Sequence, residues 1–411
     1  DGGFSWVPFG AAATVAASLI AQIGEQVDFL RFLPEPGPHN RKRWWLAVIV
    51  AGPGWIVLGG LKMMGGAFLA FLALQNEVPV AKALEPTRMY LTGFEQVVGP
   101  GEIAVVLTGV FVIVSQIKIN VTNAYAGSLA WSNFFARLTH SHPGRVVWLL
   151  FNVIIAVLLM AMGVFEALEQ VLGLYSHLAV AWVGAIVADL VISKPLGWSP
   201  RQIEFRRAHL YDINPSGFGA MLLASVLSVS AHLGLMGEHL QPASAAIALG
   251  VALVAAPLIA RLTGGRFFIA RQATDFGPRH RVMRCTVCRN RFESDDMAQC
   301  PAYGGAICSL CCTLDARCGD RCKPGSQMHE QLAPLLSRVL PRGATPAMVR
   351  RVGHYTLVLS GMFTVLGSTL WLLYAQERLR LDSLEQQSTG DMGPLFIKIL
   401  GALVLLAAVA A

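Results

Sequence analysis

Charged residues are scarce in this chain. Asp, Glu, Lys and Arg make up 14% of its 411 residues, whereas soluble domains carry about 25%. Hydrophobic residues make up 54%. This imbalance argues against an ordinary soluble domain and predicts an all-α integral membrane protein. The net charge of +7 suits anionic lipid. The interleaved basic and aromatic residues that stack bases are lacking, so we expect no nucleic-acid partner.

Catalytic constellations are also lacking. The sequence has no paired carboxylates, no Ser–His–Asp set and no glycine-rich ATP-lid motif, so we predict no catalytic residues. The run MHEQLAPLL around His329 has the spacing of a histidine-kinase phosphoacceptor box. It lies between a Cys-rich stretch and a membrane span, and we assign the match to chance. An enzyme in its own right is the least supported class for these residues.

Apolar stretches long enough to cross a bilayer, which takes about 20 residues, are present throughout the chain. Nine are predicted, at 5–24, 45–74, 103–120, 146–172, 177–193, 216–236, 243–262, 355–375 and 393–411. Gly52-Pro53-Gly54 should break or kink the second one. The first residue is Asp1 and the last stretch reaches the end of the sequence, so we expect a piece of a longer protein.

Lys and Arg gather in alternate loops between these stretches. Arg41, Lys42 and Arg43 lie in the first loop, whereas the loops at 173–176 and 237–242 have neither residue. The positive-inside rule therefore places the odd-numbered loops, including residues 263–354, in the cytosol. We predict a multi-pass membrane protein, and the resemblance described below implies the bacterial inner (cytoplasmic) membrane.

All eight cysteines fall within one polar stretch, residues 285–322. Cytosolic thiols stay reduced, so a dense cluster there favours a metal site over disulfides. Eight thiolates can make two tetrahedral four-cysteine sites, the usual arrangement for structural zinc. Spacing assigns one ion to Cys285, Cys288, Cys308 and Cys311, and the other to Cys300, Cys312, Cys318 and Cys322.

Two alternatives to zinc remain open. An iron–sulfur cluster is one, because Cys308, Cys311, Cys318 and Cys322 with Pro324 faintly echo ferredoxin spacing. A redox-active thiol cluster is the other. A stretch of about forty residues cannot bury enough core to fold unaided, so a metal would supply the missing stability.

Polar side chains interrupt the third apolar stretch. They are Gln116, Lys118, Asn120, Thr122 and Asn123. Polar groups at membrane depth are costly unless they face a cavity, a partner or a substrate. Gln116, Asn120 and Asn123 recur at helical spacing and share one face, which predicts a polar cavity for a solute. Hydrogen bonding between helices is the alternative.

Three runs resemble purine–cytosine permeases, members of the nucleobase–cation symporter family. YAGSLAWSN, residues 125–133, looks like the family's eighth helix. DFLRF, residues 28–32, resembles the cytoplasmic end of the family's sixth helix. RRAHLYDINPSGFGAML, residues 206–222, resembles the loop before the family's eleventh helix. The likeness covers about residues 1–270. It implies a partial inverted-repeat transporter fold of about seven helices, the family's sixth to twelfth.

The resemblance also implies site residues. Substrate contacts would come from Ala17, Ser18 and Gln22, and from Asn120, Thr122 and Asn123. Lys118 stands where the family has a small residue close to its cation site, so its ammonium could substitute for sodium. Snorkelling or pairing with a carboxylate is the alternative role. The family's first five helices are absent, so these residues alone should not form a complete carrier.

The organisation predicted for the rest of the chain is a Cys-rich metal-binding domain at 271–330, a linker at 331–354 and two additional spans at 355–411. It looks like bacterial sensor histidine kinases whose N-terminal half is a permease. We therefore expect a recognition or transport module for a nucleobase-like or related small polar solute, serving as a kinase's sensory input. Downstream kinase modules and a response regulator would be its partners, with lipid around it. The alternative is a symporter with a regulatory zinc-binding tail.

Overall fold

The computed structural model describes residues 3–22, 33–83 except 35, 85–139, 144–161, 165–278, 281–314 and 318–331 except 329, with 359 and 367 as isolated positions. The predicted linker and last two spans, apart from Gln331 and those isolated positions, lie outside the described residues. So do His329 and the DFLRF run. The chain falls into two compact units, one of residues 1–21 with 130–411 and one of residues 22–129. Each unit is described by itself.

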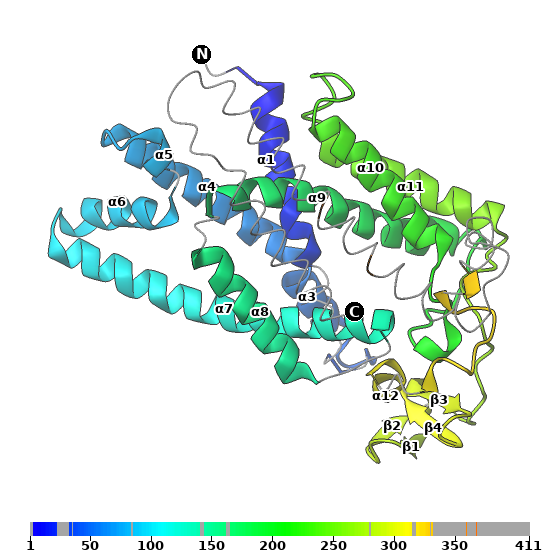
Figure 1. The fold of residues 1–411 in the computed structure, drawn as a ribbon. Helices are drawn as coiled ribbons and strands as arrows, with labels where there is room; N and C mark the ends of the chain where they lie inside the picture. The colour runs from blue at the N-terminus through cyan, green and yellow to red at the C-terminus, as the bar shows by residue number, and fades with distance from the viewer. Residues whose placement is uncertain are drawn as a thin grey trace. The chain divides into compact units, whose positions relative to one another are not determined.

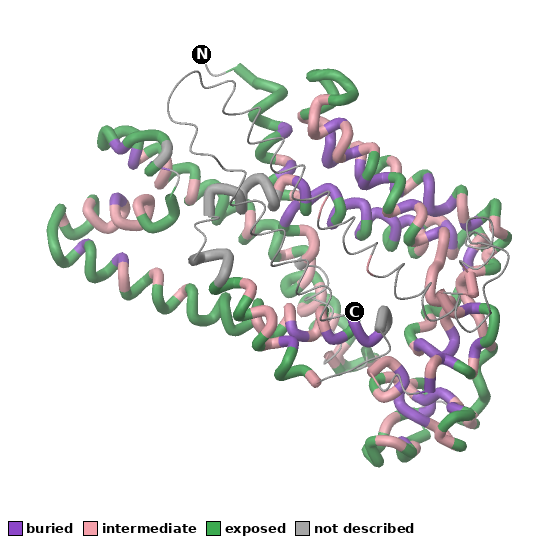
Figure 2. The backbone as a smooth tube through the Cα atoms, in the orientation of Figure 1, coloured by how far each residue is buried: buried purple, intermediate pink, exposed green. Residues whose placement is uncertain are grey.

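Three helices packed through small side chains form the centre of the first unit. They are α9 (Phe165–Ala188), α10 (Ala220–His232) and α11 (Ser244–Leu262). Their contact surface is rich in buried alanines. Buried positions of these helices appear as purple segments in Figure 2. A Cβ added at Gly184 of α9 would lie 2.9 Å from the Cβ of Ala252, so glycine permits this close approach. Small residues at helix contacts are typical of packing within membranes.

Two further helices belong to this unit. α1 (Trp6–Ser18) packs against α9, with Ala17 touching the alanine-rich core. α8 (Arg145–Ala161) packs against the end of α7 (Glu102–Thr139), where the rings of Trp148 and Phe135 stack at 4.5 Å.

Two π-helical turns enclose the connection between α9 and α10. The first, Asp189–Ser193, ends α9, and the second, Pro215–Gly219, begins the approach to α10. The Ser216 hydroxyl donates to the Ala256 carbonyl at 2.8 Å, which attaches the second turn to α11. We call the intervening residues 194–214 the α9–α10 loop. Arg207–His209 form a single 3-10 turn within it.

The second unit is helical as well. It contains α3 (Arg41–Ala51), α4 (Gly54–Gln75), α5 (Val80–Ala83), α6 (Pro86–Val98) and α7 up to residue 129. Helix α3 ends just before Gly52-Pro53 and α4 follows at once, which confirms the predicted break (Figure 1). Proline has no backbone N–H and clashes with the preceding turn, so it interrupts the hydrogen-bond ladder there.

Four helices are long and apolar enough to span a membrane. They are Arg41–Gln75, which is α3 and α4 taken together, Glu102–Ala136, Gly173–Ser193 and Ser244–Leu262. The shorter apolar helices are Trp6–Ala21 and Arg145–Val157. The chain is thus largely helical and has the helices of a membrane protein, which confirms the prediction at this level. Most large apolar side chains of α4 and α7 are exposed, as a lipid-facing surface requires.

Three predicted spans have wrong boundaries. Residues 165–172, predicted to close the span 146–172, belong to α9, because Glu166, Ala167 and Leu168 are strong helix formers that extend it backwards. The predicted span 103–120 continues as one helix to Thr139. The predicted span 216–236 is a π-helical turn followed by the 13 residues of α10, and is not among the four long apolar helices.

The Cys-rich segment is built on two antiparallel hairpins. Strand β1 (Val282–Arg284) pairs with β2 (Arg291–Glu293), and β3 (Met297–Cys300) pairs with β4 (Gly305–Cys308), which leads into α12 (Ser309–Leu314). Its buried core consists of Ala208, Cys285, Met297, Ala298, Cys300, Ile307, Cys308, Cys312 and Cys318. Cysteines supply five of these nine residues. Ala208 enters this core from the α9–α10 loop.

Candidate metal centre

Four cysteines of the Cys-rich segment form a candidate metal site. The Sγ atoms of Cys285, Cys288, Cys308 and Cys311 all lie within 4.8 Å of one another. The Cys288 and Cys308 Sγ atoms are 3.9 Å apart. Tetrahedral zinc with Zn–S bonds of about 2.3 Å would place its sulfurs about 3.8 Å apart. This set is the one predicted from spacing for the first ion, and the cluster could hold a metal.

Turn geometry presents the first two ligands. Cys285 and Cys288 lie in the turn between β1 and β2, where the Cys285 N–H donates to the Asn290 carbonyl at 2.9 Å. The Arg289 N–H donates to the Cys285 carbonyl at 2.9 Å, and Arg289 has a φ of 61°. This left-handed residue reverses the chain just after the second ligand.

Close contact between backbones brings the other two ligands to the same place. The Thr286 N–H and hydroxyl both donate to the Ala306 carbonyl, at 3.0 and 2.9 Å. A Cβ on Gly305 would lie 2.6 Å from the Thr286 Oγ1, so only glycine fits at the start of β4. Cys308 ends that strand and Cys311 follows in α12. The four thiols therefore meet because one turn packs against one strand.

Backbone amides favour the thiolate form at part of this site. The Cys308 N–H donates to the Cys285 Sγ at 3.3 Å, and the Cys311 N–H donates to the Cys308 Sγ at 3.4 Å. Burial opposes ionisation of Cys285, but hydrogen bonds from the backbone of Cys308, Cys288 and Val287 lower its pKa to about 6. Burial raises the pKa of Cys308 and Cys311. A bound cation would favour the thiolate at all four.

All eight cysteines are free thiols rather than disulfides. The 3.9 Å separation of Cys288 and Cys308 is far beyond a disulfide bond of about 2.05 Å. Four sulfur donors suit zinc or iron, and their chemistry does not select between the two ions.

The predicted second set, Cys300, Cys312, Cys318 and Cys322, is more buried than the first. Cys300, Cys312 and Cys318 are buried, and Cys322 is half-buried. Burial raises the pKa of Cys318, and the negative charges of Asp320, Cys300 and Cys322 raise it further. Burial raises the pKa of Cys312 to about 12, with Cys322 and Cys318 contributing. Cys300, Cys312 and Cys318 belong to one buried cluster and Cys322 packs against it. Among the described residues, only the first set has its sulfur atoms gathered closely enough to hold one metal ion.

Arg207 of the α9–α10 loop attaches that loop to the Cys-rich segment. Its side chain is only 2% exposed, and its Nε and Nη2 donate to the Asp320 Oδ2 at 3.0 and 2.8 Å. Its Nη1 donates to the carbonyls of Ala136 and Thr313 at 3.1 and 3.5 Å. Asp320 lies between Cys318 and Cys322 in the sequence.

Lys323 of the Cys-rich segment makes a second contact, with residues of the α9–α10 loop. Its side chain is fully buried, and its Nζ donates to the Asp212 Oδ1 at 2.6 Å and to the Leu210 carbonyl at 2.9 Å. The same Nζ lies 3.6 Å from the Asp320 Oδ2. Arg207, Asp212, Asp320 and Lys323, which we call the ion quartet, hold two positive and two negative charges and are neutral as a group.

Backbone contacts extend the attachment on both sides of the quartet. The Asp212 N–H donates to the Ser326 carbonyl and the Ile213 N–H to the Gln331 Oε1, both at 3.0 Å. Arg206 pairs with Glu204 at 2.7 Å and donates to the Met297 carbonyl at 3.0 Å.

The predicted solute residues lie in different parts of the chain. Gln116, Lys118, Asn120, Thr122 and Asn123 are exposed on α7, in the second unit. Ala17 and Ser18 lie in α1 of the first unit, where the buried Ser18 hydroxyl donates to the Val15 carbonyl at 2.7 Å. Gln22 ends a 3-10 turn, and its side chain is not described. The solute site is not tested by this arrangement and stays a prediction.

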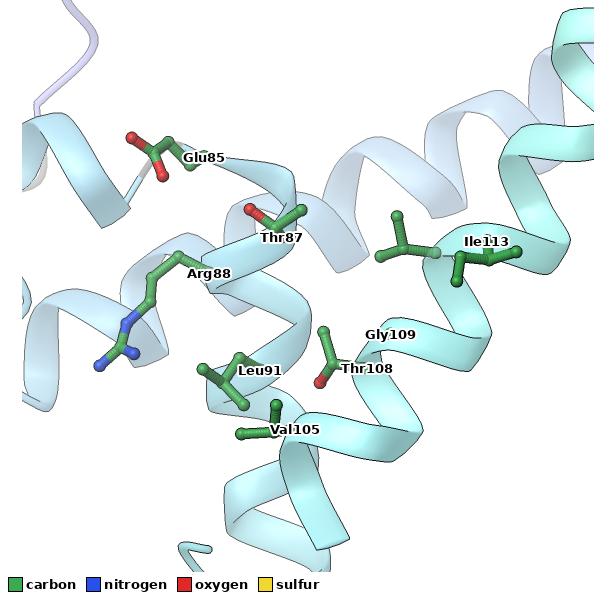
Figure 3. Close-up of a pocket in the computed structure, with 9 residues that line it drawn as sticks. Glu85, Thr87, Arg88, Leu91, Val105, Thr108, Gly109 and Ile113 are labelled. Atoms are coloured by element: carbon green, nitrogen blue, oxygen red, sulfur yellow. The ribbon is translucent and has the colours of Figure 1, made fainter. Parts of the chain in front are cut away.

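A groove of about 400 Å³ lies elsewhere in the second unit. Its lining residues are Glu85, Thr87, Arg88, Leu91, Val105, Thr108, Gly109, Val112 and Ile113. Figure 3 shows Leu91 of α6 close to Val105 and Thr108 of α7, with the charged Glu85 and Arg88 at the edge. The Thr108 hydroxyl donates to the Ala104 carbonyl at 2.7 Å within its own helix. None of the predicted solute residues lines this groove.

The ion quartet was missed by the sequence interpretation. Its partners are separated by 111 and 113 positions, so the sequence does not reveal their pairing. One signal was available, since Asp320 lies between Cys318 and Cys322 in the sequence and Lys323 directly follows Cys322. No protein-family model, no curated protein and no solved structure matches this chain.

Proposed function

We propose that the chain is the membrane-embedded input module of a sensor protein, with a zinc-stapled cytosolic segment that relays changes in its helices. The observation that carries the proposal is the attachment of the Cys-rich segment to the α9–α10 loop through the ion quartet. A passive tail would need no buried charges at its contact with the helices. Charges are buried only where good geometry compensates the loss of water, as at this contact.

Structural zinc is the ion proposed for the first cysteine set, and a second zinc is proposed for Cys300, Cys312, Cys318 and Cys322. Support comes from the clustered thiols, the absence of disulfides and the small core made mostly of cysteines. Metal analysis of the purified protein tests this. We expect a colourless protein with about two zinc ions per chain. A brown protein with iron and acid-labile sulfide would replace zinc with an iron–sulfur cluster.

The ligand proposed for the membrane helices is a small polar solute of the nucleobase type. Support comes from the amide and hydroxyl groups on α7, which suit the donor–acceptor edge of a heterocycle. The test is binding of labelled nucleobases to the protein in nanodiscs, with Asn120→Leu against the apolar exchange Ile119→Leu as matched control. Loss of binding only in Asn120→Leu supports the site, and equal binding in both variants contradicts it.

A symporter with a regulatory zinc tail is the second candidate. Lys118 allows sodium-independent solute binding to be distinguished from sodium-dependent binding, because its ammonium is proposed to replace sodium. Lys118→Ser should make solute binding dependent on sodium, and binding that stays independent of sodium would count against this role. Solute uptake into proteoliposomes under a sodium or proton gradient would favour the symporter over the sensor. Solute-dependent autophosphorylation of the natural protein would favour the sensor.

A further inference from the structure

We infer that the second cysteine set is a regulatory metal site whose occupancy fixes the conformation of the α9–α10 loop. The inference rests on the proposed second zinc and adds a role to it. The first set would then be structural, and the second would connect metal binding to the membrane helices.

The position of Asp320 is the first reason. Asp320 lies between Cys318 and Cys322, and it has a φ of 52° directly after Gly319 at 58°. Two successive left-handed residues make a tight turn that is costly for a non-glycine residue. A metal bound by the cysteines on both sides would hold this turn closed and fix the carboxylate of Asp320.

The cost of losing that carboxylate is the second reason. Arg207 is 2% exposed and Lys323 is fully buried, and Asp320 contacts both. If the turn opened, both cations would lose an anion while remaining out of water, which is strongly unfavourable. The α9–α10 loop would then have to move so that Arg207 reaches water. Metal loss at the second set and rearrangement of the loop are therefore coupled.

The continuity of the contact is the third reason. Ala208 of the loop belongs to the same buried cluster as Cys300, Cys312 and Cys318, a cluster that also contains Cys285 and Cys308 of the first set. The loop itself is enclosed by the two π-helical turns, Asp189–Ser193 and Pro215–Gly219. Such turns are rare and are frequently found at functional sites. A loop movement could thus pass into α9 and α10.

Cys285 and Cys308 of the first cysteine set share the buried cluster with Ala208, but no cysteine of the first set flanks a member of the ion quartet in the sequence. The ligands of the first set are joined to each other through Thr286, Gly305 and Ala306, all within the Cys-rich segment. The two sets therefore provide a matched pair of variants, Cys288→Ser for the first and Cys322→Ser for the second.

The experiment is hydrogen exchange of the full chain in nanodiscs, read at peptides covering residues 204–214, together with zinc content. Zinc-loaded protein is compared with protein treated with a zinc chelator and with chelated protein to which zinc is returned. Chelation and Cys322→Ser should each speed exchange of the Asp212 and Ile213 amides about tenfold or more, since their acceptors lie beyond Cys322. Cys288→Ser should change this exchange less than about twofold, and returned zinc should restore protection.

The failures are distinguishable. One outcome would be two zinc ions in wild type and one in Cys322→Ser, with unchanged exchange at 204–214. This result would overturn the regulatory role and leave the proposed second zinc intact. One zinc in wild type that Cys322→Ser retains would overturn both. Equal acceleration in both variants would overturn the assignment to the second set. Should Cys322→Ser fail to fold, chelation of wild type decides alone, and protection of the loop that survives chelation would refute the inference.

Discussion

The charge of Asp320 should be worth far more than that of an exposed carboxylate in the same segment. Asn at position 320 keeps the shape of the side chain and tolerates the left-handed φ of 52°, so Asp320→Asn changes mainly the charge. The variant leaves Arg207 and Lys323 buried with one anion, Asp212, between them. Breaking a buried ion pair costs about 3–5 kcal/mol.

We expect a value at the lower end of that range. Lys323 keeps Asp212, and Arg207 keeps two carbonyl acceptors. A cost of about 3 kcal/mol corresponds to about a hundredfold faster exchange of amides that open with the segment after Cys318. Lys323→Met added to Asp320→Asn removes the surplus cation and should recover part of the loss.

Hydrogen exchange of the zinc-loaded full chain measures this change. The matched control is Asp295→Asn, an exposed carboxylate of the same segment, which should shift the opening free energy by less than about 0.5 kcal/mol. If Asp320→Asn behaves like this control, the ion quartet does not hold the loop and the reasoning fails.

Three further predictions concern the metal, the acid response and the helix packing. Cys308→Ser should lower the zinc content by one ion per chain, whereas the exposed Leu310→Ala should leave it unchanged, by metal analysis of both proteins. Burial raises the pKa of Glu204, but hydrogen bonds from its neighbours His209 and Arg206 outweigh this and lower it well below 4.5. The ionised Glu204 therefore stabilises the fold fully above about pH 4.5, and this stabilisation is lost as the pH falls below that value. In a plot of melting temperature against pH, Glu204→Gln should reduce the fall in stability on the acid side, and an unchanged fall would contradict this. Gly184→Ala should separate α9 from α11 and lower the free energy of unfolding in detergent by about 1–3 kcal/mol. Gly250→Ala is the control and should leave this free energy unchanged, because a Cβ there meets open space. Equal destabilisation by both variants would show that the close approach of α9 and α11 is unimportant.

The sequence predicted those features that depend on nearby residues. The pairing of Cys285 and Cys288 with Cys308 and Cys311 followed from spacing, because each C-x2-C turn presents its two thiols on one side. The break at Gly52-Pro53 followed from the missing N–H of proline.

Features that depend on distant partners or on helix ends were not predictable in the same way. Apolar composition shows which residues tolerate lipid, but α7 continues through polar residues to Thr139 because they too can be helical. The strands of the Cys-rich segment were not foreseen either, since they are only three or four residues long. The ion quartet joins segments more than a hundred positions apart, so it required the folded chain.

The length of α7 restricts where a solute could meet it. A helix of 38 residues is about 57 Å long, against a hydrocarbon thickness of about 30 Å. Even a tilt of about 40° places only about 26 residues in that layer. About twelve residues must therefore project into water or the headgroups, at one end or divided between both ends. If the more apolar first half is the immersed part, Asn120 and Asn123 come near the boundary with water, where a solute would arrive without crossing the bilayer centre.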